Sequence, residues 1–352
     1  MTPAEPPRFL FLPDAGPEIG GGHVMRSLTL TRALAARGAH CAMLADDFTR
    51  GLMQAFAGAD VERVGAEGHA PEQLLAVVER LGERFDVAVV DHFRWTAEHD
   101  EALAAAGLRA ATIDDLADRR RAVDWLLDPT PRSAAAYDGL VPPGARVFCG
   151  PSYALIRSEF AALREASLAR RRDGGPVKRV LAAFGLTDFG GITAQAAEAL
   201  GADLQALEVD WVVGAEASSR PMLRTASAER PGWRVRVAEP DMAGLTAQAD
   251  AALGAGGSST WERACLGVPT VTLVLADNQE PGTRALLDAR ATLAVDVRRS
   301  GWRSELREAW AALAGDAALR RELSENAADL CDGRGADRAA DSLMALAAQP
   351  RG

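Results

Sequence analysis

The feature that most constrains the fold is an alternation of short apolar segments with helical patterns, which runs through the chain twice. The first series of apolar segments has the length of buried strands and covers residues 9–12, 40–44, 87–90 and 109–113. Helical spacing separates them over 23–37, 74–84 and 96–106. A second series follows, with expected strands at 180–183, 209–213, 235–237, 251–253 and 270–275. This alternation favours parallel sheets covered by helices on both faces.

The length of the chain, 352 residues, is too great for one ordinary core and predicts two domains. We expect one Rossmann-like domain over 1–165, a second over 176–330, and a final helical segment over 331–352. The charged stretch 164–173 and the Gly-Gly-Pro that follows it are the expected linker. Because strands of open parallel sheets end at ligand sites, the two domains are expected to present their strand ends to a central cleft.

The charge balance excludes several classes of partner. Asp and Glu number 49 and Lys and Arg 39, so the net charge is −10. An acidic surface repels nucleic acids and anionic membranes, and we expect neither as a partner. No apolar run approaches the ~20 residues that span a bilayer, and residues 1–8 lack a signal pattern, which predicts a cytoplasmic location. The oligomeric state stays open, a monomer included.

Neither the cysteines nor the other ligating residues indicate a metal site or a cofactor. The four cysteines, Cys41, Cys149, Cys265 and Cys331, form no CxxC motif and lie in or beside apolar stretches. They are therefore expected to be buried free thiols in a reducing compartment. No His, Asp, Glu and Cys residues have metal-ligand spacing, and no cofactor is expected.

The strongest local motif is the turn Gly254-Ala255-Gly256-Gly257-Ser258-Ser259, which follows an expected strand and precedes a helix. Glycines let a ligand approach the backbone, and the first N–H groups of a helix have no partners within it, so the turn fits an anion. Glu262, one turn into the helix, is placed to accept hydrogen bonds from a ribose. The alternative is a serine-capped helix with Glu262 in the capping position.

A second motif, Gly20-Gly21-Gly22-His23, follows the first strand and opens the first helix. An imidazole there is placed to take a proton from water as a general base. The alternative is a histidine that caps or packs the start of the helix. Arg26 lies almost one turn later and either binds an anionic ligand group or pairs with an acid such as Asp14 or Glu18.

Carboxylates stand at the ends of two further strands. Asp91, Asp114 and Asp115 are candidates to bind sugar hydroxyl or amide groups, and N-capping of the following helices is the competing interpretation.

Several segments, in order, resemble the UDP-2,4-diacetamido-2,4,6-trideoxy-β-L-altropyranose hydrolases of the pseudaminic acid pathway, which serves flagellin glycosylation. The resemblance runs from about residue 8 to 340, and the matching segments are 19–30, 90–93, 113–116, 150–160, 256–262, 277–280 and 332–336. The C-terminal half also resembles the wider GT-B group of UDP-sugar enzymes.

The resemblance implies a GT-B fold whose last helix packs back on the first domain, and hydrolysis of a UDP-sugar at its anomeric carbon without a metal. His23 would be the catalytic base. The residues implied for the sugar or diphosphate are Gly21, Gly22, Arg26, Asp91, Asn278 and Gln279, and those implied for UDP are Met242, Gly256, Gly257, Ser258, Ser259 and Glu262.

Some positions depart from the pattern of that family. Phe93 stands where a tyrosine is common, Leu186 replaces a glycine in an expected Gly-Gly-x-Asp turn, and Pro13 replaces a small residue. These departures leave open which sugar is used and which of Asp14, Asp91, Asp114 and Asp115 contacts it. Rival functions are a GT-B glycosyltransferase, a hydrolysing UDP-sugar 2-epimerase, and a nucleotide-sugar-binding protein without turnover.

Overall fold

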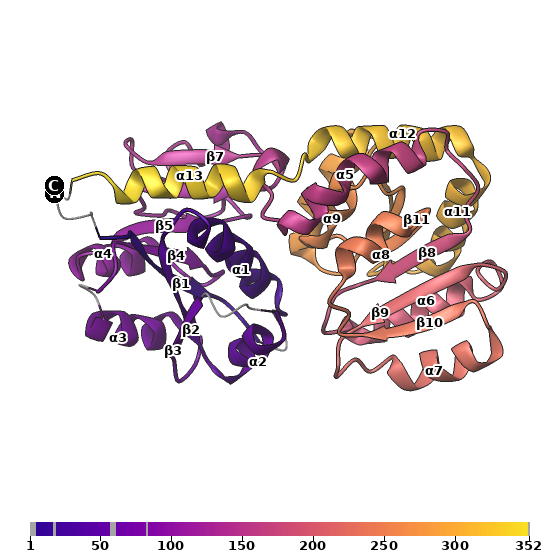
Figure 1. Ribbon diagram of the computed structural model, residues 1–352, viewed down its shortest axis with the longest axis horizontal. Helices are drawn as coiled ribbons and strands as arrows, with labels where there is room; N and C mark the ends of the chain where they lie inside the picture. Colours follow the sequence, from indigo (N-terminus) through magenta and orange to yellow (C-terminus); the bar gives the residue numbers. More distant parts are fainter. Residues whose placement is uncertain (1–4, 17–18, 57–60, 82–83, 351–352) are drawn as a thin grey trace. The chain divides into compact units, whose positions relative to one another are not determined.

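The expected strands belong to two parallel sheets, one in each of two units of the chain. The computed structural model describes residues 5–16, 19–56, 61–81 and 84–350. Unit 1 comprises residues 1–155 and 334–352, and unit 2 comprises residues 156–333. Figure 1 shows the helices and strands of each unit, coloured along the sequence.

Unit 1 contains a seven-stranded sheet in the order β3-β2-β1-β4-β5-β6-β7. Its strands are β1 (Arg8–Pro13), β2 (His40–Ala45), β3 (Val61–Gly65), β4 (Val87–Asp91), β5 (Arg109–Ile113), β6 (Trp125–Asp128) and β7 (Arg146–Cys149). Its helices are α1 (Gly22–Ala35), α2 (Asp47–Phe56), α3 (Pro71–Leu81), α4 (Ala97–Ala105) and α13 (Gly335–Ala347), with short 3₁₀ turns η2 (Ala134–Tyr137) and η3 (Pro151–Tyr153).

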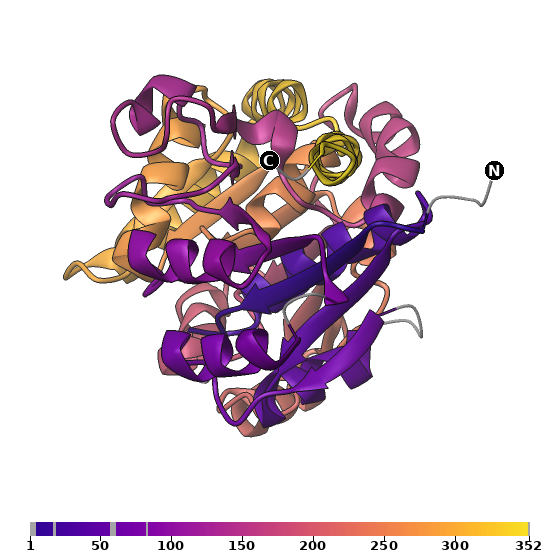
Figure 2. The same ribbon diagram turned by 90° about the vertical axis from the view of Figure 1, so that its left-hand side faces the viewer.

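Alternate residues of the strands in unit 1 pack on opposite faces of the sheet. Phe9 and Phe11 of β1 pack with α1 and α13, whereas Leu10 and Leu12 pack with α3 and α4. Both faces are therefore buried, which explains why these strands are continuous apolar runs rather than alternating ones. Figure 1 shows α13, in yellow, returning to the sheet of unit 1, and Figure 2 shows the same helix almost end-on.

Unit 2 contains a six-stranded sheet in the order β10-β9-β8-β11-β12-β13. Its strands are β8 (Arg179–Ala183), β9 (Glu208–Val213), β10 (Trp233–Val237), β11 (Ala251–Ala255), β12 (Thr270–Val274) and β13 (Leu293–Asp296). Its helices are α5 (Ser158–Arg171), α6 (Ile192–Leu200), α7 (Arg220–Glu229), α8 (Met242–Gln248), α9 (Ser259–Cys265), α10 (Glu280–Asp288), α11 (Trp302–Gly315) and α12 (Ala317–Leu330), with 3₁₀ turns η4 (Phe189–Gly191) and η5 (Asp277–Gln279).

The expected linker over 164–173 is wrong, because residues 164–171 belong to α5 and the whole stretch lies in unit 2. Phe160, Ser167 and Arg171 form its buried face, and Arg171 donates hydrogen bonds to the carbonyl oxygens of Thr246 and Ala249 at the end of α8. The chain passes from unit 1 to unit 2 near residue 155, about ten residues earlier than the expected boundary, and returns to unit 1 near residue 334.

The four cysteines are free thiols, of which Cys149 is half-buried and the other three are buried. Among the residues that the structure describes, every helix is too short or too polar to cross a membrane. Within the same residues, no group of three or more His, Cys, Asp or Glu side chains is placed to hold a metal ion.

Candidate functional site

The strand order of each sheet marks where a ligand site forms. The order of strands reverses between β1 and β4 in unit 1 and between β8 and β11 in unit 2. In open parallel sheets, ligands bind outside the carboxyl ends of the strands at such a reversal. In unit 1, His23 follows β1 and Asp91 ends β4; in unit 2, the turn 256–258 follows β11. The two motifs singled out from the sequence therefore lie at the two reversals.

His23 and Asp91 form a hydrogen-bonded pair in unit 1. Nδ1 of His23 lies 2.6 Å from Oδ1 of Asp91 and 3.1 Å from its carbonyl oxygen, so Nδ1 carries a proton and donates it. The other ring nitrogen, Nε2, has no partner among the described residues and is not enclosed, although the residue is only 6% exposed. The pair thus fixes the ring with an unoccupied acceptor nitrogen that water can reach.

Arg26 holds the carboxylate of that pair. Its Nε and Nη2 each donate to one oxygen of Asp91 at 2.5 Å, and its Nη1 donates to Asp115 at 3.0 Å. Burial disfavours the ionised form of Asp91, but Arg26 and His23 outweigh it and hold the pKa of this carboxyl below its ordinary value. Of the two interpretations left open for Arg26, the structure shows pairing with acids, and those acids are Asp91 and Asp115.

Phe93 and the glycines before His23 determine how the imidazole and the start of α1 are packed. The Phe93 ring packs edge-on against the imidazole, with centroids 4.5 Å apart. Gly21 is buried, and a Cβ there would lie 2.8 Å from a methyl group of Leu52, so this glycine lets α1 pack on α2. Gly22 begins α1 and is exposed. Gly22, rather than Gly21, is therefore accessible to a ligand.

Asp14, one of the acids considered for sugar binding, is enclosed within unit 1. It is fully buried, and neither carboxylate oxygen has a hydrogen-bond partner among the described residues. The imidazole of His92 lies beside it, with Nδ1 3.4 Å from Oδ2 of Asp14. Asp14 therefore faces a second buried histidine rather than an open surface.

Asp91 and Asp114 do not cap helices. Asp114 accepts hydrogen bonds from Tyr137 Oη and from the N–H of Leu116. Asp91 is engaged by His23 and Arg26, and α4 has its own cap at Thr96. The N-cap interpretation of these acids is therefore wrong.

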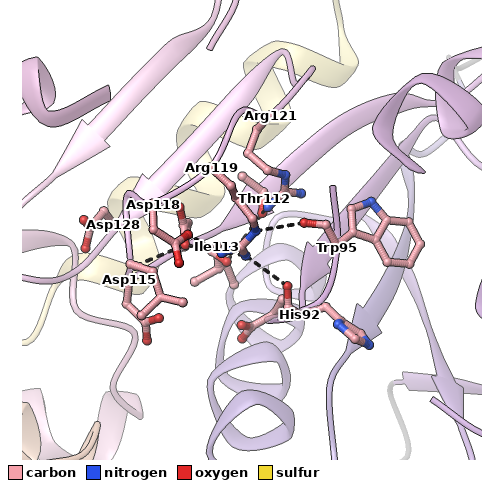
Figure 3. Close-up of polar contacts among 12 residues, drawn as sticks. His92, Trp95, Thr112, Ile113, Asp115, Asp118, Arg119, Arg121 and Asp128 are labelled. Atoms are coloured by element: carbon pink, nitrogen blue, oxygen red, sulfur yellow. Dashed lines mark hydrogen bonds and ion pairs between the residues drawn. The ribbon is translucent and has the colours of Figure 1, made fainter. Parts of the chain in front are cut away.

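Arg119 joins the loops that follow β4 and β5. Its Nε donates to the carbonyl oxygen of Trp95 at 2.9 Å and its Nη2 to that of His92 at 3.3 Å, as Figure 3 shows. A third nitrogen, Nη1, donates to Asp118 at 2.6 Å. This side chain stabilises the loop that carries Asp115 beside the end of β4.

In unit 2, the turn after β11 leaves N–H groups without protein partners. The N–H of Gly256 donates to Leu273 and that of Thr260 to Gly257. Among the described residues, nothing accepts from the N–H groups of Gly257, Ser258 and Ser259. The Ser258 side chain does not cap α9, so the serine-capped alternative is not what the structure shows. Three consecutive amides are available to an anion.

The three glycines of this turn are required for different reasons. A Cβ on Gly254 would lie 2.4 Å from Cζ of Arg263, and one on Gly256 would lie 2.5 Å from Oγ1 of Thr283. Both of these glycines let neighbouring side chains pack against the strand end. A Cβ on Gly257 would meet nothing within 4 Å. Gly257 is thus the glycine whose open side leaves space for a ligand.

Glu262, expected to bind a ribose, is half-buried and accepts a hydrogen bond from Nη2 of Arg157 at 3.3 Å. Burial raises the pKa of its carboxyl above the ordinary value, opposed by Arg157. Met242 opens α8 directly after its N-cap, Asp241. Asn278 is exposed in η5, whereas Oε1 of Gln279 accepts from the N–H of Leu275 at 3.0 Å.

The loop after β8 contains Leu186 and Asp188 of the expected Gly-Gly-x-Asp turn. Leu186 has an ordinary backbone conformation, whereas Asp188 has a positive φ of 49°. The Asp188 carboxylate accepts from the N–H groups of Thr193 and Ser219, so it holds the starts of α6 and α7 together. The aspartate of the expected turn therefore organises this loop, and the position of Leu186 does not require the positive φ that favours glycine.

Sequence reasoning did not identify the role of Arg263, which lies beneath the turn 254–259, or the pairing of Arg26 with Asp115. The signal for Arg263 was available: it stands four residues after Ser259, so the two side chains lie on the same face of a helix.

A comparison with protein-family models finds none that matches the chain. The chain is 26% identical over 203 residues to the spore coat polysaccharide biosynthesis protein SpsG of Bacillus subtilis, covering 57% of this chain and 59% of that protein. It is 26% identical over 155 residues to the UDP-2,4-diacetamido-2,4,6-trideoxy-beta-L-altropyranose hydrolase of Campylobacter jejuni, covering 44% of this chain and 53% of that protein. The matches thus span less than two thirds of either relative.

Solved structures are similar over nearly the whole chain. MurG of Acinetobacter baumannii has a TM-score of 0.65 at 14% identity, covering 97% of this chain and 100% of that one. A variant of Os79 from O. sativa in complex with UDP has a TM-score of 0.69 at 15% identity, with coverages of 97% and 100%. A putative UDP-N-acetylglucosamine 2-epimerase from Listeria monocytogenes has a TM-score of 0.61 at 14% identity, covering 97% of each chain. The chain therefore has a GT-B-like fold of two Rossmann-like units, and it is related in sequence to a protein named as a UDP-sugar hydrolase.

Proposed function

We propose that the protein hydrolyses a UDP-activated 2,4-diacetamido-2,4,6-trideoxy sugar at its anomeric carbon, releasing UDP and the free sugar for nonulosonic acid synthesis. The observation that carries the proposal is the hydrogen-bonded pair of His23 and Asp91 at the strand reversal of unit 1. The identity of the sugar is taken from the name of the Campylobacter jejuni relative, of which the match covers 53%.

In unit 1, the pair is organised as a general base. Asp91 accepts the proton of His23 Nδ1, which leaves the lone pair of Nε2 to take a proton from water. The hydroxide so formed attacks C1 from the face opposite UDP, the C1–O bond breaks, and the sugar inverts its configuration. Because Arg26 binds both oxygens of Asp91, the carboxylate stays ionised and keeps the imidazole in this orientation.

In unit 2, the turn after β11 is the proposed binding site for the diphosphate. The free N–H groups of Gly257, Ser258 and Ser259 would bind phosphate oxygens and stabilise the charge that develops on departing UDP. We assign the ribose to Glu262, the uracil to the segment beside Met242, and contacts with the diphosphate or sugar to Asn278 and Gln279. The proposal requires His23 and this turn to act on the same substrate molecule.

The structural neighbours favour a second candidate, transfer of the sugar to an acceptor. Solved structures such as those of Os79 and the spinosyn rhamnosyltransferase SpnG share the fold, and SpsG is named for polysaccharide biosynthesis. A base that deprotonates an acceptor hydroxyl would need the same geometry as one that deprotonates water. The fold similarity alone does not distinguish the two reactions.

The deciding experiment incubates the protein with the candidate UDP-sugar in ¹⁸O-water without any acceptor. Hydrolysis at carbon places the label on the sugar and releases UDP that carries no label, whereas attack at phosphorus would label the UDP. Release of UDP only after an acceptor is added would instead establish a glycosyltransferase, and loss of the C2 hydrogen to solvent would establish an epimerase.

The variants H23A and H40A provide the matched test of the base. H23A should abolish turnover while UDP still binds, whereas H40A should keep full activity, since His40 pairs with Glu62 away from Asp91. Equal loss of UDP affinity and turnover in H23A would contradict the assignment of His23 as base.

A further inference from the structure

The side chain of Arg263 lies buried beneath the turn that we assign to the diphosphate. The residue is 5% exposed. Its Nη2 donates to the carbonyl oxygen of Ala255 at 2.8 Å and to Oγ1 of Thr260 at 3.0 Å, and its Nη1 donates to Oγ of Ser259 at 3.1 Å. These contacts join the end of β11 to the first turn of α9, so one guanidinium connects both ends of the turn.

The sequence of β11 makes room for this cation. The guanidinium packs against the α-carbon of Gly254, where any larger residue would place its Cβ 2.4 Å from Cζ of Arg263. The glycine belongs to the strand and has no positive φ that would otherwise require it. Gly254 therefore serves the packing of Arg263 and not the approach of a ligand.

Among the described residues, Arg263 makes no hydrogen bond or ion pair with a carboxylate, and Glu262 acts on its charge only through space. None of its hydrogen bonds goes to a carboxylate, and its Nε is buried without an acceptor. Burial lowers the pKa of Arg263 to about 10, with Glu262 opposing. A buried cation without a directly bound anion is unfavourable, so an anion bound at the turn would relieve this cost.

The other buried arginines of the described residues either bind a carboxylate or donate to several carbonyl oxygens, as Arg320 does at the end of α11. Arg121 pairs with both oxygens of Asp100. Arg171 has no carboxylate hydrogen bond, but its Nη2 donates to carbonyl oxygens at the C-terminal end of α8, where the helix presents partial negative charge. Arg263 belongs to the last turn of α9, but its guanidinium lies against the first turn, where it donates to the hydroxyl groups of Ser259 and Thr260 and to one carbonyl oxygen, that of Ala255.

We propose that Arg263 is a positioning residue for the diphosphate of the substrate, a fixed positive charge that also holds the turn in its anion-binding conformation. This inference rests on the proposed function. Arg263 would add a buried source of positive potential to that of the backbone amides. Ligand binding at the turn should therefore depend on the negative charge of the ligand. UDP should gain from Arg263, whereas uridine, which lacks phosphate, should not.

The test compares the dissociation constants of UDP and uridine for the wild-type protein, R263K and R263Q. R263Q should weaken UDP binding by about 10- to 100-fold, the range expected for lost charge-assisted interactions, and change uridine binding less than about threefold. R263K keeps the charge but cannot reach all three acceptors, so its ratio of UDP to uridine affinity should lie between the other two. Equal ratios in all three proteins would overturn the inference.

R171Q is the matched control, because it removes a similarly buried, carboxylate-free arginine from the same unit. It should lower thermal stability while leaving the ratio of UDP to uridine affinity unchanged. If R263Q does not fold, R263K alone decides: a lower ratio supports the inference and an unchanged ratio overturns it. If the wild-type protein binds no UDP, the proposed function fails as well, which separates the two outcomes.

Discussion

Nδ1 of His23 and Oδ1 of Asp91 lie 2.6 Å apart, although the two residues are separated by 68 positions in the sequence. The parallel pairing of β1 with β4 brings them together, because Pro13 is aligned with Asp91 and α1 begins shortly after β1. The geometry of the proposed base is thus a direct consequence of the order of strands in the sheet.

Replacing Asp91 with asparagine should lower kcat by about 10²- to 10⁴-fold, the usual contribution of a positioned base. An amide cannot stabilise the imidazolium that forms, and it allows the ring to adopt the other tautomer. UDP affinity should not change, since Asp91 belongs to unit 1. D100N is the control: it breaks a comparable buried pair with Arg121, and the folded protein should retain its kcat. Equal kcat values for D91N and the wild type would contradict the role of the pair.

Asp91 should also make the free energy of unfolding depend on pH in the acid range. Its folded-state pKa lies below the unfolded value of about 3.9, so its stabilisation is fully present above pH ~4 and is lost as the pH falls below that value. Thermal midpoints of the wild type and D91N should therefore differ by a constant amount between about pH 8 and 5 and converge below about pH 4. A difference that stays constant down to about pH 3 would show that Asp91 does not titrate in this way.

Alanine substitutions in the turn after β11 should separate ligand binding from packing. G257A places a methyl group in open space, so we expect a normal thermal midpoint and UDP binding weakened by about tenfold or more, or about 1.4 kcal/mol. G256A forces a methyl group against Thr283 and should lower the midpoint instead. Unchanged UDP binding by G257A, measured by calorimetry, would place the diphosphate elsewhere.

The helix that returns to unit 1 should contribute measurably to its stability. Leu343 of α13 is fully buried with the apolar face of the sheet, and L343A should destabilise unit 1 by about 2–5 kcal/mol. Chemical denaturation followed by circular dichroism and by total tryptophan fluorescence measures the loss; Trp125, whose Nε1 donates to Ser342 at 2.8 Å, is one of the seven tryptophans that contribute to that fluorescence. L287A is a suitable control, since Leu287 is 39% exposed and should cost much less.

The parallel sheets were predictable because their strands are continuous apolar runs. The elements that were missed have weaker patterns. The helix α5 contains a run of charged residues and buries only a few side chains, so the sequence of its second half has the pattern of a linker. The strand β6 has only four residues, Trp125–Asp128, too few to show a period.

The candidate site was only partly predictable from the sequence. The positions of His23, Asp91 and the glycine turn follow from their places at strand ends, which are local properties. Their partners are not local: the pairing of Arg26 with Asp115 spans 89 positions, and the packing of Arg263 on Gly254 depends on how α9 folds back over its own strand. The sequence therefore indicated which residues gather at each reversal but not which of them neutralise one another.

The return of α13 has a consequence for how the protein is made. The sheet of unit 1 is complete once the ribosome has passed residue 149, yet its apolar face lacks Ala339, Ala340 and Leu343 until all of unit 2 has been synthesised. Unit 2 is contiguous in sequence and can fold as soon as residue 333 emerges. An apolar surface of unit 1 is therefore exposed in the nascent chain while unit 2 is translated. Unit 1 is synthesised first but completes its hydrophobic core last.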